Sequence, residues 1–76
     1  MKIYGQKDCA KCDELRAVLD AKDVHYEYID LHDPSLDKEE AAHVMSQVVI
    51  NGGQLPIVAL NDSLFSFDNI MKVVNV

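Results

Sequence analysis

KIYGQKDCAKC, residues 2–12, is the stretch that decides the fold of this chain. It begins with a short β-branched and aromatic run, residues 2–4, which predicts a strand. A loop over residues 5–8 then leads to Cys9 and Cys12, which are separated by two residues and are the only cysteines present. We therefore expect a strand and a loop that deliver a dithiol to the start of the next element.

The residues around the dithiol predict an amphipathic helix from residue 10 to about residue 22. Leu15, Val18 and Leu19 recur at helical spacing, with charged residues on the other faces. Asp8 is the expected N-cap. The first thiol then meets the unsatisfied N–H groups of the helix, and the second lies one turn further in, so the motif indicates dithiol–disulfide exchange.

Residues 24–31 carry aromatic and branched side chains in partial alternation and predict a second strand. With residues 2–4 and the helix between them, this strand makes a βαβ unit with parallel strands and a right-handed crossover. The loop before the helix then lies at the carboxyl edge of the sheet, where α/β proteins tend to place their sites.

The second half of the chain predicts a helix, a hairpin and a third helix. Asn51-Gly52-Gly53 ends the second helix of the chain. Residues 57–60 then form a buried strand, residues 61–62 a tight turn, and residues 63–66 the antiparallel partner of that strand. Asp68 and Asn69 are expected to open the last helix, with Asp68 either capping it or interacting favourably with the helix dipole. The apolar face expected on the second helix consists of Leu36, Ala41, Ala42, Met45, Val48 and Val49.

The resulting order, β-α-β-α-β-β-α, predicts an α/β protein with a thioredoxin-like fold, in which three helices pack on a four-stranded mixed sheet. Residues 1–76 are expected to form a single domain, because a core of this size leaves little room for a second site or a large cofactor cavity.

Charge and hydropathy restrict the partners. Thirteen acidic and seven basic residues give a formal net charge of −6, which repels nucleic acid and an anionic membrane. No stretch approaches the roughly 20 apolar residues of a membrane span, and the N-terminus has no apolar run of signal-peptide length. We expect a cytoplasmic monomer, in a compartment where disulfides are usually transient and catalytic.

Residues scattered along the whole chain resemble the glutaredoxin family. They are Tyr4 before the first cysteine, the dithiol Cys9 and Cys12, Leu55-Pro56 in place of the family's Val-Pro, and Phe67-Asp68-Asn69 where Gly-Gly-x-Asp-Asp is usual. The resemblance implies thiol–disulfide exchange on disulfide-containing proteins or glutathione mixed disulfides, with glutathione as reductant and no tightly bound cofactor. In some members of the family it also implies electron donation to ribonucleotide reductase.

Several positions depart from the common glutaredoxin pattern. Ala10 and Lys11 replace the usual Pro-Tyr between the cysteines, Gln6 stands where many members have lysine, and Phe65-Ser66 replaces Gly-Gly. A related group of glutaredoxin-like redoxins serves ribonucleotide reductase and takes electrons from thioredoxin reductase. The electron donor therefore stays open between glutathione and thioredoxin reductase.

The two cysteines are assigned different roles. Cys9 is the expected nucleophile, because the helix N-terminus and the nearby Lys7 and Lys11 favour a thiolate. Neighbouring acidic residues oppose this effect, so we expect the pKa of Cys9 to lie moderately below the free value of about 8.5. Cys12 is the expected resolving thiol, which attacks the Cys9 sulfur.

The resemblance implies the remaining site residues. Pro56 would be a cis proline facing the dithiol, and it leaves the backbone of Leu55 free to pair with a substrate strand. Bound glutathione would place its γ-glutamyl carboxylate at the N–H groups of Asp68 and Asn69. The residue expected near its other carboxylate is Gln6, Lys7 or Lys11.

Two other interpretations remain. A Cys-x-x-Cys pair is also half of a zinc site, but such a site needs two more ligands, and His25, His32 and His43 are too scattered to suggest them. No metal site is expected. The chain is alternatively a docking and redox module of a larger enzyme, whose dithiol acts on one dedicated partner.

Overall fold

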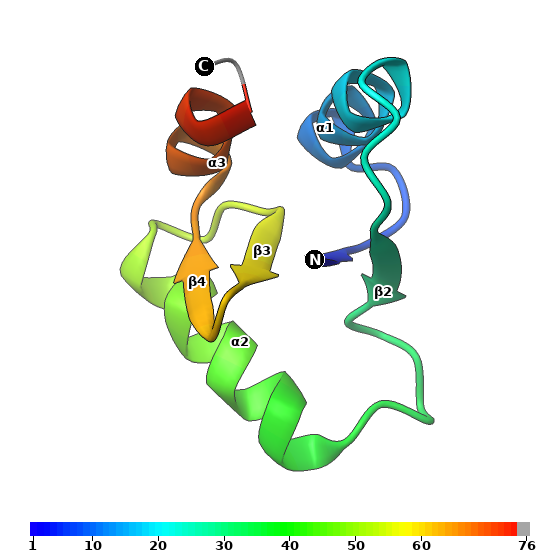
Figure 1. The fold of residues 1–76 in the computed structure, drawn as a ribbon. Coiled ribbons are helices and arrows are strands. Elements are labelled where there is room, and N and C mark those ends of the chain that lie inside the picture. Colours follow the sequence, from blue (N-terminus) through cyan, green and yellow to red (C-terminus); the bar gives the residue numbers. More distant parts are fainter. Residues whose placement is uncertain (75–76) are drawn as a thin grey trace.

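The structure, a computed structural model, describes residues 1–74 (Figure 1). Its elements are β1 (Lys2–Gly5), α1 (Ala10–Ala21), β2 (Glu27–Asp30), α2 (Lys38–Ile50), β3 (Ile57–Leu60), β4 (Ser63–Phe65) and α3 (Phe67–Val74). This is the predicted order, and the thioredoxin-like fold class is confirmed. The second strand is shorter than expected, because it begins at Glu27 rather than near Val24.

The four strands form one mixed sheet in the order β2-β1-β3-β4. β1 pairs parallel with β2, so that Gly5 lies opposite Asp30, and antiparallel with β3, so that Tyr4 lies opposite Ile57. The end of β1, the end of β2 and the start of β3 therefore meet at one edge of the sheet. β4 runs antiparallel to β3 and ends at this same edge, where α3 begins.

Helices cover both faces of the sheet, with α1 and α3 on one face and α2 on the other (Figure 1). Successive strand residues point to opposite faces, so β1 and β3 supply both cores. The core beneath α1 and α3 consists of Ile3, Leu15, Leu19, Val58 and Ile70. The core beneath α2 consists of Tyr4, Val44, Val48 and Ile57.

The predicted apolar face of α2 is partly wrong. Val44 and Val48 are the side chains that α2 buries, whereas Met45 is 46% exposed and Val49 is 74% exposed. Leu36 lies before the helix, which begins at Lys38. Apolar residues extend around more than half of the helix circumference, so two different stripes fit the helical period and only one of them meets the sheet.

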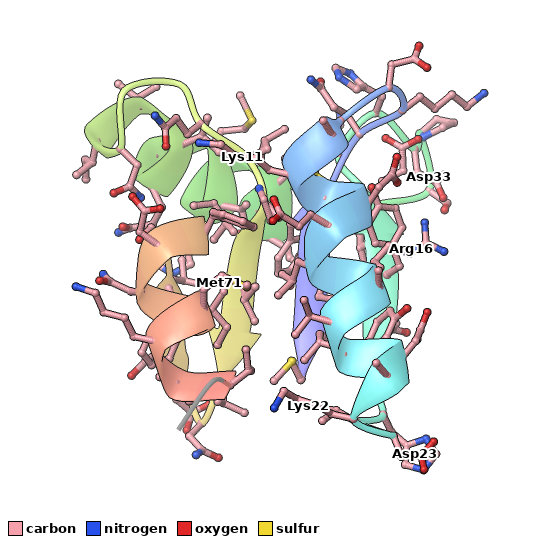
Figure 2. All side chains as sticks on the ribbon, turned by 90° about the horizontal axis from the view of Figure 1, so that it is seen from above. Lys11, Arg16, Lys22, Asp23, Asp33 and Met71 are labelled. Carbon is pink, nitrogen blue, oxygen red and sulfur yellow. A yellow bond between two sulfur atoms is a disulfide. The ribbon has the colours of Figure 1, made fainter. Side chains whose placement is uncertain are left out.

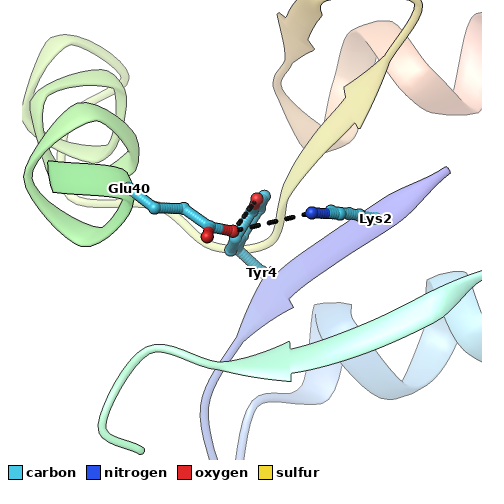
Figure 3. A network of polar contacts seen from close by, with 3 residues as sticks. All are labelled: Lys2, Tyr4 and Glu40. Carbon is cyan, nitrogen blue, oxygen red and sulfur yellow. Dashed lines mark hydrogen bonds and ion pairs between the residues drawn. The ribbon is translucent and has the colours of Figure 1, made fainter. Parts of the chain in front are cut away.

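A polar contact also ties α2 to the sheet (Figure 3). The buried Tyr4 hydroxyl donates a hydrogen bond to Glu40 Oε2, and Lys2 Nζ lies 4.0 Å from the same oxygen. Burial, followed by the hydrogen bond to Glu40, raises the pKa of Tyr4 well above its ordinary value. The phenol is therefore a stable donor that holds the first turn of α2.

The hairpin between β3 and β4 turns where it was predicted. Asn61 and Asp62 both have positive φ angles, 52° and 63°, as a tight two-residue hairpin turn requires. In the part of the chain that the structure describes, no helix has the length and apolar character needed to cross a membrane.

Candidate functional site

The dithiol lies at the first turn of α1, and its two sulfurs are joined as a disulfide with a Cα–Cα distance of 5.2 Å. Cys9 is the N-cap residue, and its Sγ accepts a hydrogen bond from the backbone N–H of Cys12 at 3.2 Å. The expectation that Asp8 caps the helix is wrong, because Asp8 occupies the turn before it with a φ of +58°. Cys9 is partly exposed and Cys12 is completely buried, so the two thiols differ in access.

Gly5 allows the end of β1 to pass close to the dithiol. A Cβ at Gly5 would lie 2.6 Å from the Tyr28 hydroxyl oxygen and 2.8 Å from Cys12 Sγ, so a side chain there would displace both atoms. The Tyr28 hydroxyl donates to the backbone carbonyl of Gln6 at 3.1 Å. Arg16 covers the Tyr28 ring at 4.4 Å from its centroid, so β2 and α1 together hold the loop that leads to Cys9.

Lys11 connects the dithiol motif with the start of α3. Its Nζ lies 5.5 Å from the centroid of the Phe67 ring, and Figure 2 shows Lys11 on the side of α1 that faces α3, whereas Arg16 lies on the opposite side. Ser66 caps α3, since its Oγ accepts the N–H of Asn69 at 3.3 Å. That N–H group is one of the two expected to bind a carboxylate. Asp68 lies in the first turn of α3, where its charge interacts favourably with the helix dipole, which is the other role predicted for it.

The Leu55–Pro56 peptide bond is cis, as the resemblance implies. Pro56 is buried and directly precedes Ile57, which lies opposite Tyr4 of β1. The register therefore places Leu55 and Pro56 beside the residues that follow β1. Within residues 1–74, no hydrogen bond uses the backbone N–H or carbonyl of Leu55, which leaves both groups available to a partner.

Gln6 forms a contact that the sequence did not predict. Its Oε1 lies 3.1 Å from His32 Nε2, which belongs to the segment after β2. The two side chains line a hollow together with Lys7 and Asp30. The parallel pairing of β1 with β2 is the signal that brings these segments together, because it aligns the residues that follow each strand.

The predicted site residues therefore gather at one edge of the sheet, although they come from three separate parts of the chain. They are Gln6, Lys7, Cys9, Lys11, Cys12, Leu55, Pro56, Asp68 and Asn69. In the range 1–74, no three His, Cys, Asp or Glu side chains are grouped so that they could hold a metal ion. A disulfide at a helix N-cap and a cis proline at the same sheet edge are features of a thioredoxin-fold redox protein.

Comparison with known proteins narrows this class to a family. The family model described as Glutaredoxin matches residues 1–65, and the chain belongs to the glutaredoxin family. The structure is similar to the crystal structure of a glutaredoxin from Archaeoglobus fulgidus, with a TM-score of 0.58 and 21% sequence identity over 99% of this chain and 85% of that chain. At this identity, the likeness supports the fold.

A search of curated protein sequences found no match to the chain. Membership of the family implies thiol–disulfide oxidoreductase activity in general, and the cysteine pair that such activity needs is present.

Proposed function

We propose that this protein reduces disulfides of proteins, or mixed disulfides with glutathione, through Cys9 and Cys12. The observation that carries this proposal is the hydrogen bond from the Cys12 N–H to Cys9 Sγ at the N-terminus of α1. In the reduced protein, the same N–H group and the helix dipole would stabilise a thiolate at Cys9. Lys7 and Lys11 add positive charge near it.

The difference in access supports the assignment of roles. The Cys9 thiolate attacks one sulfur of the substrate disulfide, which forms a mixed disulfide and releases the first substrate thiolate. Cys12 then loses its proton and attacks Cys9 Sγ, which forms the internal disulfide and releases the second substrate thiolate. Two electrons pass from the dithiol to the substrate, and both released thiolates take up protons. Because Cys12 is buried, an external disulfide reaches Cys9 first.

Leu55 is the proposed docking point for the substrate backbone. Its free N–H and carbonyl can pair with an extended segment, as in strand addition to a sheet edge. Pro56 follows it in the cis form and has no N–H of its own, so pairing at this position is confined to Leu55.

The N–H groups at the start of α3 bear on whether glutathione or thioredoxin reductase is the electron donor. Glutathione remains the donor that the family suggests, and its γ-glutamyl carboxylate would use the N–H groups of Asp68 and Asn69. The N–H of Asn69 already donates to Ser66 Oγ, so glutathione would have to displace that hydroxyl. This contact weighs against glutathione as the donor and leaves thioredoxin reductase as the second candidate. Electron donation to ribonucleotide reductase is a proposed use of either route. A reducing cytoplasm is the compartment that suits both.

One experiment separates the two donors and tests the assigned activity. The oxidised protein is supplied either with glutathione, glutathione reductase and NADPH, or with thioredoxin reductase and NADPH, and NADPH consumption is followed with a disulfide substrate. Cys9→Ser should abolish turnover with both systems, whereas Cys12→Ser should retain monothiol activity only if glutathione is the donor. Wild-type turnover by Cys9→Ser would refute the nucleophile assignment, and reduction by neither system would favour a single dedicated partner.

A further inference from the structure

An apolar groove of about 410 Å³ lies next to Leu55. Its apolar walls come from the segment after β2, from α2 and from the segment before β3, and they are Leu31, Met45, Val48 and Leu55. Gln6 and His32, which contact each other, form its polar side. Met45 is half-exposed because it lines this open groove rather than the core.

The groove is continuous with the proposed substrate path. Leu55 lines it and also carries the unpaired backbone groups, and Gln6 lines it from the loop that leads to Cys9. Side chains of an extended peptide point alternately to opposite sides. A substrate segment that pairs with Leu55 therefore places a side chain close to its own cysteine over the groove.

The residues that line the groove determine which kind of substrate side chain it can bind. Among the described residues that line the groove, none is lysine, arginine, aspartate or glutamate. A carboxylate there would lose water without meeting a lysine or arginine of the groove lining, whereas an apolar side chain would gain from burial. Lys7 and Asp30 line the neighbouring hollow, which shares Gln6 and His32 with the groove. The groove therefore suits an uncharged apolar side chain better than the glycine carboxylate of glutathione.

We propose that this groove binds an apolar side chain that flanks the attacked cysteine of a protein disulfide. The proposal rests on the proposed exchange activity and adds its substrate class, which is protein disulfides with leucine, methionine or a similar residue beside the cysteine. Met45 suits this role because an unbranched thioether adapts to side chains of different shape. The substrate peptide that carries this side chain is extended, because the free backbone N–H and carbonyl of Leu55 can then form hydrogen bonds with it.

The test uses symmetric disulfide-linked peptide dimers that differ at the residue flanking the cysteine. Leucine, serine and aspartate are compared there, and the second-order rate constant for oxidation of the pre-reduced protein is measured with each dimer. The leucine peptide should react about tenfold faster than the serine peptide, in line with the discrimination that a hydrophobic pocket achieves. The aspartate peptide should be the slowest. Equal rate constants for the three peptides would overturn the proposal.

A matched pair of variants on α2 locates the effect. Met45→Ser should reduce the ratio of the leucine rate constant to the serine rate constant to near one. Val49 lies one turn further along the same helix and outside the groove, so Val49→Ser should leave the ratio unchanged. Both wild-type side chains are exposed, so both variants are expected to fold. A ratio that survives Met45→Ser, or that falls equally in Val49→Ser, would count against the groove.

A small disulfide, bis(2-hydroxyethyl) disulfide, separates failure of this inference from failure of the proposed function. If it oxidises the reduced wild-type protein but the peptides show no preference, only the groove assignment is wrong. If neither the small disulfide nor the peptides react, the exchange activity fails and the groove assignment fails with it. If Met45→Ser instead changes the oligomeric state in sedimentation while peptide preference is unchanged, the groove is an interface between copies and the proposal is overturned.

Discussion

On the α1 and α3 side of the sheet, five side chains from four different elements are completely buried. On the α2 side, a single helix contributes two valines, and a hydrogen bond between Tyr4 and Glu40 supplements this narrower contact. The side that carries the dithiol is thus held by extensive packing. On the other side, α2 contacts the sheet through one stripe of side chains only. Other apolar side chains of α2 stay exposed to solvent, next to the residues proposed to bind substrate.

The largest expected effect is on the well-packed side. Leu15→Ala should lower the free energy of unfolding by about 3 to 4 kcal/mol, because it removes a completely buried side chain and leaves a cavity. Met45→Ala, on the α2 side, should cost less than about 1 kcal/mol, because Met45 is half-exposed. Urea unfolding of the oxidised proteins measures both values, and equal losses would remove the proposed difference between the two sides.

A matched valine pair gives the next effect. Val58→Ala, beneath α1 and α3, should cost about 2 to 3 kcal/mol, and Val44→Ala, beneath α2, about 1 to 2 kcal/mol. Both variants lose the same methyl groups, so the difference between their free energies of unfolding reports how far the neighbouring side chains move in to fill each cavity. A single helix held along one stripe is expected to shift more easily. A larger loss for Val44→Ala would reverse the comparison.

The hydrogen bond that supplements the α2 side predicts a dependence on alkaline pH. The folded-state pKa of Tyr4 is raised, so above about pH 10 the unfolded chain releases this proton while the folded protein keeps it. The unfolded state then binds fewer protons, and stability falls as pH rises, by at most about 1.4 kcal/mol per pH unit from this residue.

Tyr4→Phe should therefore lower stability by about 1 kcal/mol at pH 7, where it removes the bond to Glu40, and should make the alkaline decline shallower. Urea midpoints at pH 7, 9 and 11 measure both effects. Burial also raises the pKa of Tyr28, which leaves some alkaline decline in the variant. An identical decline in wild type and Tyr4→Phe would show that Tyr4 is not the titrating group.

The sequence predicted the dithiol side well, for physical reasons. Leu15 and Leu19 fit a single helical stripe with charged neighbours, so the buried side of α1 was unambiguous. The parallel pairing of β1 with β2 followed from the βαβ pattern, and the antiparallel pairing of β3 with β4 followed from the tight turn between them. The helix caps were harder to predict. Cys9 caps α1 in place of Asp8, and Ser66 caps α3, where Asp68 was one candidate for the cap.

The site edge was only partly predictable. The contact between Gln6 and His32 joins residues 26 positions apart, and it depends on the register of two strands rather than on a local pattern. The free backbone of Leu55 likewise depends on where the pairing of β3 begins. The buried stripe of α2 was misassigned at Met45 and Val49, because its apolar residues permit two orientations of the helix.

Val49 gives the smallest expected effect and the sharpest check of that orientation. It is 74% exposed, so replacing it by alanine removes little buried area. Alanine is also the better helix former, by up to about 0.5 kcal/mol over a β-branched residue. Val49→Ala should therefore leave the urea midpoint unchanged or raise it slightly, in contrast to Val44→Ala on the same helix. A loss comparable to that of Val44→Ala would mean that α2 also uses the stripe containing Met45 and Val49 for stability.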